Sequence, residues 1–512
     1  MSDYLNHKWR NFLNETRSPP IQRRLLREDA APSRPKDTKV TRSKKVLYYP
    51  KFQINDDFGK KGTPSRDVAE MFFSQGGKQR NLRSKIIAIN LFLNPTDEYI
   101  KKMPIKKCLG TLTMKCKLTD KEIKPFMSFG KMPLANGFLD KDEFKSEYFF
   151  KMEVGFSEDL SLFQLNEHPK PEKMFNKKYP FYTGSSELMK LHFKKYADWI
   201  KSEFLKSGSK LIEIGSNDGT FLSNFKNSSI EYVGFEPSEN VAIKAKENNI
   251  KTINDFFNPQ SIKILKNYIN NTDVISASNV ICHIPNLNNL ILTIDELLSK
   301  KGLFIFEEPY MGSMFEKTSY DQIYDEHIFM FSINSVKKIF DLYNFELIDV
   351  FPQPTHGGSM RYVISRKNEH SINQRVAEGL LMENKNNLDN LKSCLEFKKN
   401  CEISKEKITN KLKKFKNEGK KICGYAATSK STTILNYCNL DKNIINFICD
   451  TTKEKIDKFS PGTHIPIVST SHFHQNLPDV AYLFAWNHKE EIFAKEKDFI
   501  KKGGQWISHV SI

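Results

Sequence analysis

Side chains able to move protons gather at residues 320–332, where Tyr324, Glu326 and His327 stand close together. A histidine can take a proton near neutral pH, an adjacent carboxylate can orient it or support its cation, and a phenol can hydrogen-bond a developing oxyanion. The cluster therefore predicts a catalytic site at the mouth of a sheet. Taken alone, it is equally compatible with a partly buried histidine that bonds only to backbone.

Three further turns carry polar side chains that could hold a ligand. Their glycines, hydroxyls and small residues equally suit a hairpin turn, a helix N-cap or simple packing. The turn at 421–432 has the backbone amides, hydroxyls and lysine that suit a diphosphate at a helix N-terminus. The candidates are Tyr179 and Tyr182 in an aromatic turn at 179–186, His356, Gly357, Gly358, Ser359 and Arg361 before and within a strand, and Ser429, Lys430 and Ser431 after one.

A strand, turn and helix at 211–222 have the pattern of a nucleoside-binding unit. Gly215 and Gly219 let the backbone approach a ligand, and Glu236, which closes the next apolar strand, can accept both ribose hydroxyls. The dinucleotide fingerprint would also need glycines at 217 and 220, where the chain has Asn217 and Thr220. The pattern thus disfavours nicotinamide and flavin cofactors and favours S-adenosylmethionine (SAM). The alternative is an ordinary strand-turn-helix with glycine at the bend.

The elements around these residues predict an α/β protein. Strands expected at 210–214, 232–236, 273–277, 302–307, 345–351 and 361–365 alternate with helical segments, which indicates a doubly wound sheet. Strands near 421–425, 445–449, 480–484 and 505–507 predict a second, smaller Rossmann-like sheet. A helix is expected at about 186–204, and heptad-like leucines predict one or two helices between the sheets: Leu380, Leu381, Leu388 and Leu391.

These expectations divide the chain into six parts. They are a disordered basic arm (1–45), an extension of unknown role (46–104), a small accessory domain with a connecting helix (105–200), a central SAM domain (201–370), a helical connector (371–418) and a C-terminal domain (419–512). The length of 512 residues agrees with several cores.

Composition limits the classes of function. The net charge of +18 comes from lysines spread through the chain, and only 1–45 concentrates it, so a nucleic-acid partner is disfavoured. No apolar run approaches the ~20 residues that span a bilayer and no secretory signal opens the chain, so we expect no membrane partner and a cytoplasmic location. The eight cysteines include no C-x-x-C pair, which predicts neither a disulfide framework nor a zinc knuckle.

Eight motifs in order resemble the sugar C-methyltransferases of deoxysugar biosynthesis over about 105–512. They are P-L-A-N-x-F-L (133–139), Y-P-F-Y-T-G-S-S (179–186), E-I-G-S-N-D-G-T-F-L (213–222), G-F-E-P-S (234–238), N-V-x-x-H-I-P (279–285), Y-D-E-H (324–327), H-G-G-S-M-R (356–361) and P-G-T-H-I-P-I (461–467). The resemblance implies a small N-terminal domain that usually carries zinc, a central SAM-binding domain and a C-terminal domain of related fold, with a nucleotide-sugar between the last two.

The resemblance also implies a reaction. A base removes the proton beside a ketone of a nucleoside-diphosphate keto-deoxysugar, and the resulting enolate carbon attacks the SAM methyl group. His327 would be the base and Glu326 its partner, with Tyr324 and either Tyr179 or Tyr182 around the sugar. The residues implied for SAM are Glu213, Gly215, Ser216, Asn217, Asp218, Gly219, Glu236, Asp255, Phe256 and Asn279, and those for the sugar nucleotide are His356, Gly357, Gly358, Ser359, Arg361, Ser429, Lys430 and Ser431.

The chain departs from this family at the expected zinc ligands. Two C-x-x-C pairs are usual there, but the matching positions are Cys116, Thr119, Ser157 and Leu160. One thiolate cannot hold tetrahedral zinc, so we expect no structural zinc and a domain that folds by packing alone.

Other readings stay open beside the leading one. An O- or N-methyltransferase could use the same scaffold, with His327 deprotonating a hydroxyl, and a non-catalytic binding protein could have kept the fold. A homo-oligomer also stays open.

Overall fold

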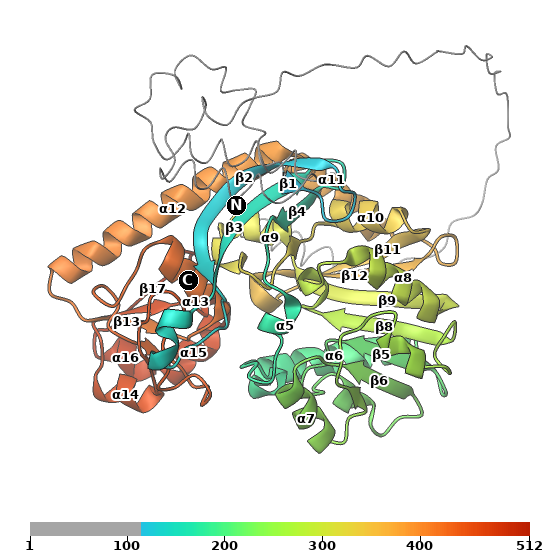
Figure 1. The fold of residues 1–512 in the computed structure, drawn as a ribbon, viewed down its shortest axis with the longest axis horizontal. Helices are drawn as coiled ribbons and strands as arrows, with labels where there is room; N and C mark the ends of the chain where they lie inside the picture. The colour runs from blue at the N-terminus through green and yellow to red at the C-terminus, as the bar shows by residue number, and fades with distance from the viewer. Residues whose placement is uncertain (1–113) are drawn as a thin grey trace, which may run out of the picture. The chain divides into compact units, whose positions relative to one another are not determined.

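The structure is a computed structural model that describes residues 114–512, and the expectations for 1–45 and 46–104 lie outside this range. Three sheets organise the described residues (Figure 1). A small antiparallel sheet comes first in the chain, a seven-stranded sheet follows, and a five-stranded parallel sheet comes last.

The seven-stranded sheet confirms the expected Rossmann-like fold. Its order is β11-β12-β9-β8-β5-β6-β7, and β12 runs antiparallel to both of its neighbours. The strands are β5 (Lys210–Ile214), β6 (Glu231–Phe235), β7 (Thr252–Ile253), β8 (Thr272–Ser278), β9 (Leu298–Pro309), β11 (Phe345–Gln353) and β12 (Ser359–Arg366). Every expected strand of this sheet overlaps an observed one. The order reverses at β5, so the ends of β5 and β8 form the crevice where such sheets bind ligands.

Helices cover this sheet, which explains why its central strands β5 and β8 are buried almost throughout. Four of the five residues of β5 are buried, rather than every second one. The helices are α6 (Glu187–Glu203), α7 (Glu239–Glu247), α8 (Leu287–Leu297), α9 (Met311–Lys317) and α10 (Ile333–Asp341). The expected helix at about 186–204 is α6, and Ser186 caps it by accepting from the Met189 amide.

The small sheet reaches the candidate catalytic loop through its last strand. Its order is β1-β2-β3-β4-β10, with β1 (Met114–Lys115), β2 (Glu122–Pro133), β3 (Phe149–Ser157), β4 (Leu162–Leu165) and β10 (Phe329–Met330). Phe329 pairs with Gln164 and Met330 with Phe163. The residues just after His327 therefore belong to a sheet built almost entirely from the accessory domain, which fixes one end of the loop. A short helix, α5 (Pro171–Met174), follows β4.

The C-terminal sheet is parallel, in the order β15-β14-β13-β16-β17. Its strands are β13 (Ile422–Tyr425), β14 (Ile448–Cys449), β15 (Ile467–Val468), β16 (Val480–Leu483) and β17 (Gln505–Ile507), and its helices are α13 (Ser429–Tyr437), α14 (Thr470–Gln475), α15 (Lys489–Lys495) and α16 (Lys497–Lys501).

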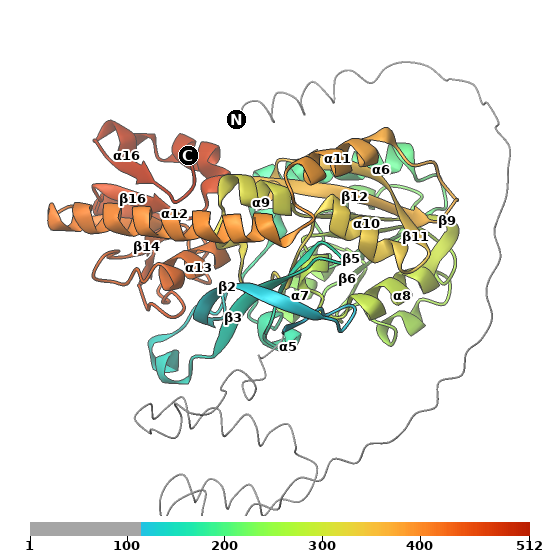
Figure 2. The same ribbon diagram turned by 90° about the horizontal axis from the view of Figure 1, so that it is seen from above.

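Two helices connect the larger sheets, as expected, and of the four expected leucines Leu388 is buried, Leu380 and Leu391 pack against the core, and only Leu381 does not. The two helices are α11 (Gln374–Lys385) and α12 (Leu391–Asn417), and α12 passes from the central sheet to the C-terminal sheet (Figures 1 and 2). Leu381 is 70% exposed, whereas α12 buries Cys394, Phe397, Cys401, Ile408, Leu412 and Phe415. Among residues 114–512, no helix has the combination of length and apolar character that crossing a bilayer requires.

Candidate active site

The candidate base His327 is buried and held by both ring nitrogens. It follows the 3₁₀ turn η8 (Tyr320–Gln322), and its Nδ1 lies 2.7 Å from the Gln322 carbonyl oxygen. A carbonyl only accepts, so Nδ1 carries the proton and Nε2 presents a lone pair. The hydroxyl of Tyr324 donates to Nε2 at 2.7 Å. Burial lowers the pKa of His327 well below its usual value, so the ring is neutral and able to take a proton.

The two acids before His327 point toward the accessory domain. Asp325 accepts from the Ala135 amide at 2.9 Å, and Glu326 accepts from the Asn136 side chain at 2.7 Å and from the Tyr179 hydroxyl at 3.2 Å. Burial raises the pKa of both carboxyls, and their mutual repulsion adds to the rise for Asp325. The structure shows no hydrogen bond between Glu326 and His327. Any support of the histidine by Glu326 therefore acts through charge rather than direct contact.

The structure adds His283, which the sequence reasoning did not select. His283 lies in the 3₁₀ turn η7 (Ile281–His283), and its ring stacks on that of His327 with centroids 5.4 Å apart. Its Nε2 is buried without a partner, and burial lowers its pKa to about 3. Glu308 holds this turn by accepting from three successive amides, those of Val280, Ile281 and Cys282, at 3.0, 2.6 and 3.2 Å. The histidine of N-V-x-x-H-I-P, just after a central strand, was the signal that could have identified it.

The aromatic turn at 179–186 contacts two loops. One is the catalytic loop at 320–332, and the other is the glycine loop at 215–219. Tyr179 reaches Glu326, whereas the Tyr182 hydroxyl accepts from the Asn240 side chain at 2.7 Å. Of the two tyrosines, the geometry thus favours Tyr179 as the one beside the reacting groups. Asn217 fastens the turn by accepting from the Thr183 amide at 2.8 Å, and Asp218 does so by accepting from Gly184 at 2.8 Å. These two side chains, expected to bind SAM, are used within the protein.

The residues at the ends of β5, β6 and β8 fit SAM. Gly215 has a φ of +68°, and a Cβ there would collide with Val280, so this position needs glycine. Several polar atoms around the loop are buried without partners: Glu213 Oε2, Ser216 Oγ, Ser238 Oγ, Asn240 Oδ1 and Asn279 Oδ1. Burial, with Asp218 and Glu236 nearby, raises the pKa of Glu213 well above its usual value. Unpaired acceptors and converging carboxylates suit a ligand that carries an ammonium and a sulfonium group.

Glu236 lies where a ribose-binding carboxylate should lie. It is buried and accepts from the amides of Asn217 and Ser238 at 3.1 and 2.8 Å. Asp255 is exposed and accepts from the Phe256 amide at 2.7 Å. Their contacts with the cofactor remain predictions.

The side chains expected to hold the sugar nucleotide are largely engaged with the protein. Arg361 forms a buried ion pair with Glu307 at 2.5 Å and lies over the rings of Tyr196 and Trp199. Lys430 is buried and donates to Asn487 at 3.0 Å. Ser431 pairs with Thr428 in the capping box of α13, and Ser359 donates to the Thr355 carbonyl at 3.0 Å. Ser429 is half-buried at the start of α13.

The turn at 355–358 is shaped by its contact with the C-terminal domain. It forms the 3₁₀ turn η9 (Thr355–Gly357) beside η10 (Trp486–His488), and a Cβ on Gly357 would overlap the Trp486 ring. Gly358 has a φ of +126°, and a Cβ there would meet the Ser313 side chain. His356 is buried here, and burial lowers its pKa to about 3. The glycines therefore serve a close approach of two domains.

The positions that match zinc ligands do not fit the metal. Cys116, Ser157 and Leu160 are buried, and the Thr119 hydroxyl oxygen is buried without a partner. One thiol, two hydroxyls and a leucine cannot supply tetrahedral Cys/His ligation. Polar contacts join the two turns instead: Lys121 pairs with Asp159 at 2.6 Å, and Gln164 bonds to the backbone of Lys115 and Lys117 at 2.8 and 3.0 Å.

A cavity of about 530 Å³ opens onto Asp325 and Glu326, which we call the acid pair. Its lining includes Asn136, Phe138, Tyr179, Asp325 and Glu326. Ligand pockets usually have volumes of about 300–1,000 Å³. We call it the catalytic cavity.

The sheet with its antiparallel β12, the glycine loop and the acidic end of β6 together define a SAM-dependent methyltransferase. Family models agree: a methyltransferase domain matches residues 189–350, a C-methyltransferase C-terminal domain matches 354–511, and a domain proposed to bind zinc matches 116–175. The chain belongs to the C-methyltransferase family.

A curated relative and solved structures are similar to the chain. C-methyltransferase NovU of Streptomyces niveus is 28% identical over 384 residues, which cover 74% of this chain and 91% of that protein. A SAM-dependent methyltransferase from Archaeoglobus fulgidus is 20% identical with a TM-score of 0.27, over 36% of this chain and 74% of that one. Magnesium protoporphyrin IX methyltransferase from Synechocystis PCC 6803 is 12% identical with a TM-score of 0.26, over 35% and 79%.

Proposed function

We propose that this enzyme transfers a methyl group to the carbon beside a ketone of a nucleoside-diphosphate keto-deoxysugar. The observation that carries the proposal is the state of His327. Its neutral ring has Nδ1 fixed to a carbonyl and an Nε2 lone pair whose partner is the Tyr324 hydroxyl. A carbon acid needs a base of this kind, because the proton beside a ketone must be removed before the carbon can act as a nucleophile.

Tyr324 has a second part in the reaction. Burial raises the pKa of its phenol well above the usual value, so the group remains a hydrogen-bond donor. A substrate that reaches His327 takes the place of the Tyr324 hydrogen bond on Nε2. The freed hydroxyl can then donate to the oxygen of the ketone as that oxygen gains negative charge.

Each proton and electron pair of the methyl transfer can be accounted for. Nε2 of His327 takes the proton, and the C–H electrons form the enolate, whose oxygen the phenol stabilises. Bound SAM supplies the electrophilic methyl group, the enolate carbon forms the new C–C bond, and the C–S electrons remain on the departing thioether. The unpaired acceptors near Glu213 orient the cofactor, and the relative NovU, a C-methyltransferase by name, supports carbon as the acceptor.

Two measurements test the proposal. Calorimetry should find one site for SAM and a second, saturable site for nucleoside diphosphates. His327→Gln should keep SAM affinity within about twofold and lose about 10²–10⁴-fold in turnover, the range for a general base. Retained turnover would reject His327 as the base, and loss of SAM binding would show that the substitution disturbed the fold.

A further inference from the structure

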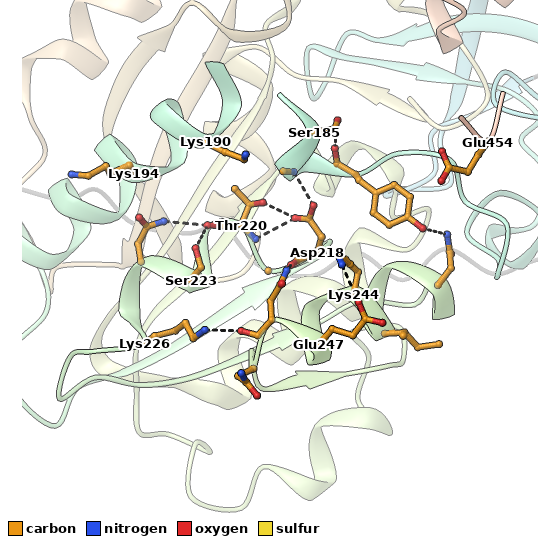
Figure 3. A pocket seen from close by; sticks show the side chains of 18 residues that line it. Ser185, Lys190, Lys194, Asp218, Thr220, Ser223, Lys226, Lys244, Glu247 and Glu454 are labelled. Atoms are coloured by element: carbon orange, nitrogen blue, oxygen red, sulfur yellow. Dashed lines mark hydrogen bonds and ion pairs between the residues drawn. The ribbon is translucent and has the colours of Figure 1, made fainter. Parts of the chain in front are cut away.

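Two hollows in the described part of the chain carry lysines, and they differ in whether those lysines are paired. The larger, of about 1,070 Å³, lies beside Asp218 on the central domain (Figure 3). Its lysines have carboxylate or carbonyl partners: Lys190 with Glu187 at 2.7 Å, Lys194 with Asp198 at 3.1 Å, Lys244 with Glu247 at 3.0 Å and Lys226 with the Asn248 carbonyl at 2.7 Å. Among the lysines of this hollow, only Lys226 therefore lacks a carboxylate partner within the described residues.

The catalytic cavity is different. Four lysines line it, Lys173, Lys177, Lys178 and Lys458, and we call them the lysine rim. Lys177 and Lys178 are exposed and make no ion pair with any residue in 114–512. Lys458 lies 3.5 Å from Asp140, and Lys173 lies over the ring of Tyr148. The cavity thus runs from a buried floor at Asp325 and Glu326 to an exposed, cationic edge.

Local structure fixes Lys177 and Lys178 relative to the reacting groups. Asn176 accepts from the Lys178 amide at 2.8 Å and donates to the Lys173 carbonyl at 2.9 Å, and the Tyr179 amide donates to the Asn176 carbonyl at 3.1 Å. The next side chain, Tyr179, reaches the floor of the cavity and donates to Glu326. A ligand that fills the cavity can therefore meet the catalytic loop at one end and the lysines at the other.

Glu143 and Glu454 on the cavity wall offset part of this charge, but the four lysines outnumber them. Glu143 already accepts from the Asp140 amide at 2.8 Å, and Glu454 is exposed. At the floor, burial raises the pKa of Asp325 and Glu326, so the pair carries less than its full negative charge near neutral pH. Lysine binds phosphate as a point charge, and an anion placed among several ammonium groups relieves their mutual repulsion.

We propose that the lysine rim, with Lys177 and Lys178 at its centre, binds the diphosphate of the substrate. The keto-sugar then enters first and meets Tyr179 and Glu326 on the floor of the cavity, next to the loop that carries His327, while the nucleoside stays near the rim. This placement replaces the diphosphate site expected at Ser429, Lys430 and Ser431, since Lys430 and Ser431 are engaged elsewhere. Only the identity of the sugar rests on the proposed function, because the rim would bind any compact diphosphate.

The test compares two double variants of the full-length protein that remove equal charge. Lys177→Ala with Lys178→Ala alters the rim, and Lys190→Ala with Lys194→Ala alters the larger hollow. Each protein is titrated calorimetrically with inorganic diphosphate, with uridine and thymidine diphosphates, and with SAM. The thermal unfolding midpoint of each variant shows that it has folded.

The rim variant should bind all three diphosphates about tenfold or more weakly and with a shallower salt dependence, while its SAM affinity stays the same. The control variant should stay within about twofold of the unaltered protein, as for lysines far from the bound anion. Equal losses in both variants, or none in the rim variant, would overturn the proposal. Absence of diphosphate binding by the unaltered protein would overturn it as well. In that case, SAM binding and methyl transfer to a phosphate-free sugar would show that the methyltransferase assignment still holds and that only the diphosphate site is wrong.

Discussion

At the scale of single residues, the chemistry depends on which groups carry protons at neutral pH. Burial lowers the pKa of His327 and raises those of Asp325 and Glu326. Because the pKa of His327 is lowered, its ring is unprotonated near neutral pH and can accept a proton. Because the carboxyl pKa values are raised, Asp325 and Glu326 titrate in a pH range in which His327 is already neutral. Glu326 has two hydrogen-bond donors and suits the ionised form, and its charge can support the imidazolium that forms when His327 takes a proton.

These pKa shifts predict how the rate of methyl transfer falls on the acidic side of its pH profile. As the pH falls, the acid pair gains its second proton before His327 titrates, so activity should fall at a pH well above the usual glutamate pKa. Glu326→Gln should lower turnover and move this limb toward acid, because the remaining limb then belongs to His327. The initial rate at saturating SAM, measured against pH, checks this. A limb that does not move in Glu326→Gln would show that the acid pair does not control it.

Sequence reasoning at this scale could group residues that are close in the chain, although it assigned the Tyr324 phenol only to a developing oxyanion. Tyr324 and His327 are three positions apart, and their hydrogen bond follows from one local turn. It failed for His283 and for the partners of Glu326, because these contacts join separate segments: His283 comes from η7, Asn136 from the accessory domain and Tyr179 from the aromatic turn. Arg361, expected near substrate, is drawn instead to Glu307 on the neighbouring strand.

At the scale of elements, the strands were the most predictable feature, because parallel strands covered by helices are apolar almost throughout. The strand expected at 210–214 is β5, residue for residue. Of the heptad-like leucines, Leu380, Leu388 and Leu391 contribute to packing and only Leu381 is exposed, while α12 adds apolar contacts beyond residue 391 that the pattern did not include. Strand β10 could not be predicted, since two residues give no periodic signal and their partner, β4, lies in another domain.

The accessory domain gives a prediction about metal. The family model for 116–175 describes a domain proposed to bind zinc, yet of the four matching positions only Cys116 can supply a thiolate. Elemental analysis of protein purified without chelators should therefore find no stoichiometric zinc. Treatment with a strong chelator should also leave the melting temperature unchanged, because packing and the Lys121–Asp159 pair join the two turns. One equivalent of zinc, lost together with stability in Cys116→Ser, would contradict this.

At the scale of the whole molecule, buried polar contacts join the C-terminal domain to the catalytic region. Asp321, in η8, accepts from the Trp486 indole at 2.7 Å and lies 3.1 Å from His509 Nε2. Burial alone would raise the pKa of Asp321, but the charges of His509 and Lys430 and the bond from Trp486 outweigh it and lower that pKa. Thr433 on α13 also donates to the Ile323 carbonyl at 2.9 Å. The C-terminal sheet therefore helps to position the loop that carries His327.

Asp321→Asn should destabilise the protein by about 2–4 kcal/mol, because it leaves buried partners without their carboxylate. A folded-state pKa below the unfolded value contributes stability above the unfolded pKa that is lost as the pH falls through the folded pKa. The difference in melting temperature between the two proteins should therefore shrink in acid. Asp498→Asn, at a carboxylate 82% exposed, is the matched control and should change stability by at most about 0.5 kcal/mol. Equal melting temperatures for Asp321→Asn and its parent at neutral pH would contradict this account.

The most direct test of the central claim follows the transferred carbon. The full-length enzyme is incubated with SAM labelled with ¹³C at the methyl group and with a nucleoside-diphosphate keto-deoxysugar, and the product is examined by NMR. The account predicts that the label is bonded to the ring carbon beside the ketone, that the proton of that carbon is lost, and that His327→Gln forms this product at least about 10²-fold more slowly. Label on an oxygen or nitrogen, or on a carbon whose proton is retained, would contradict it.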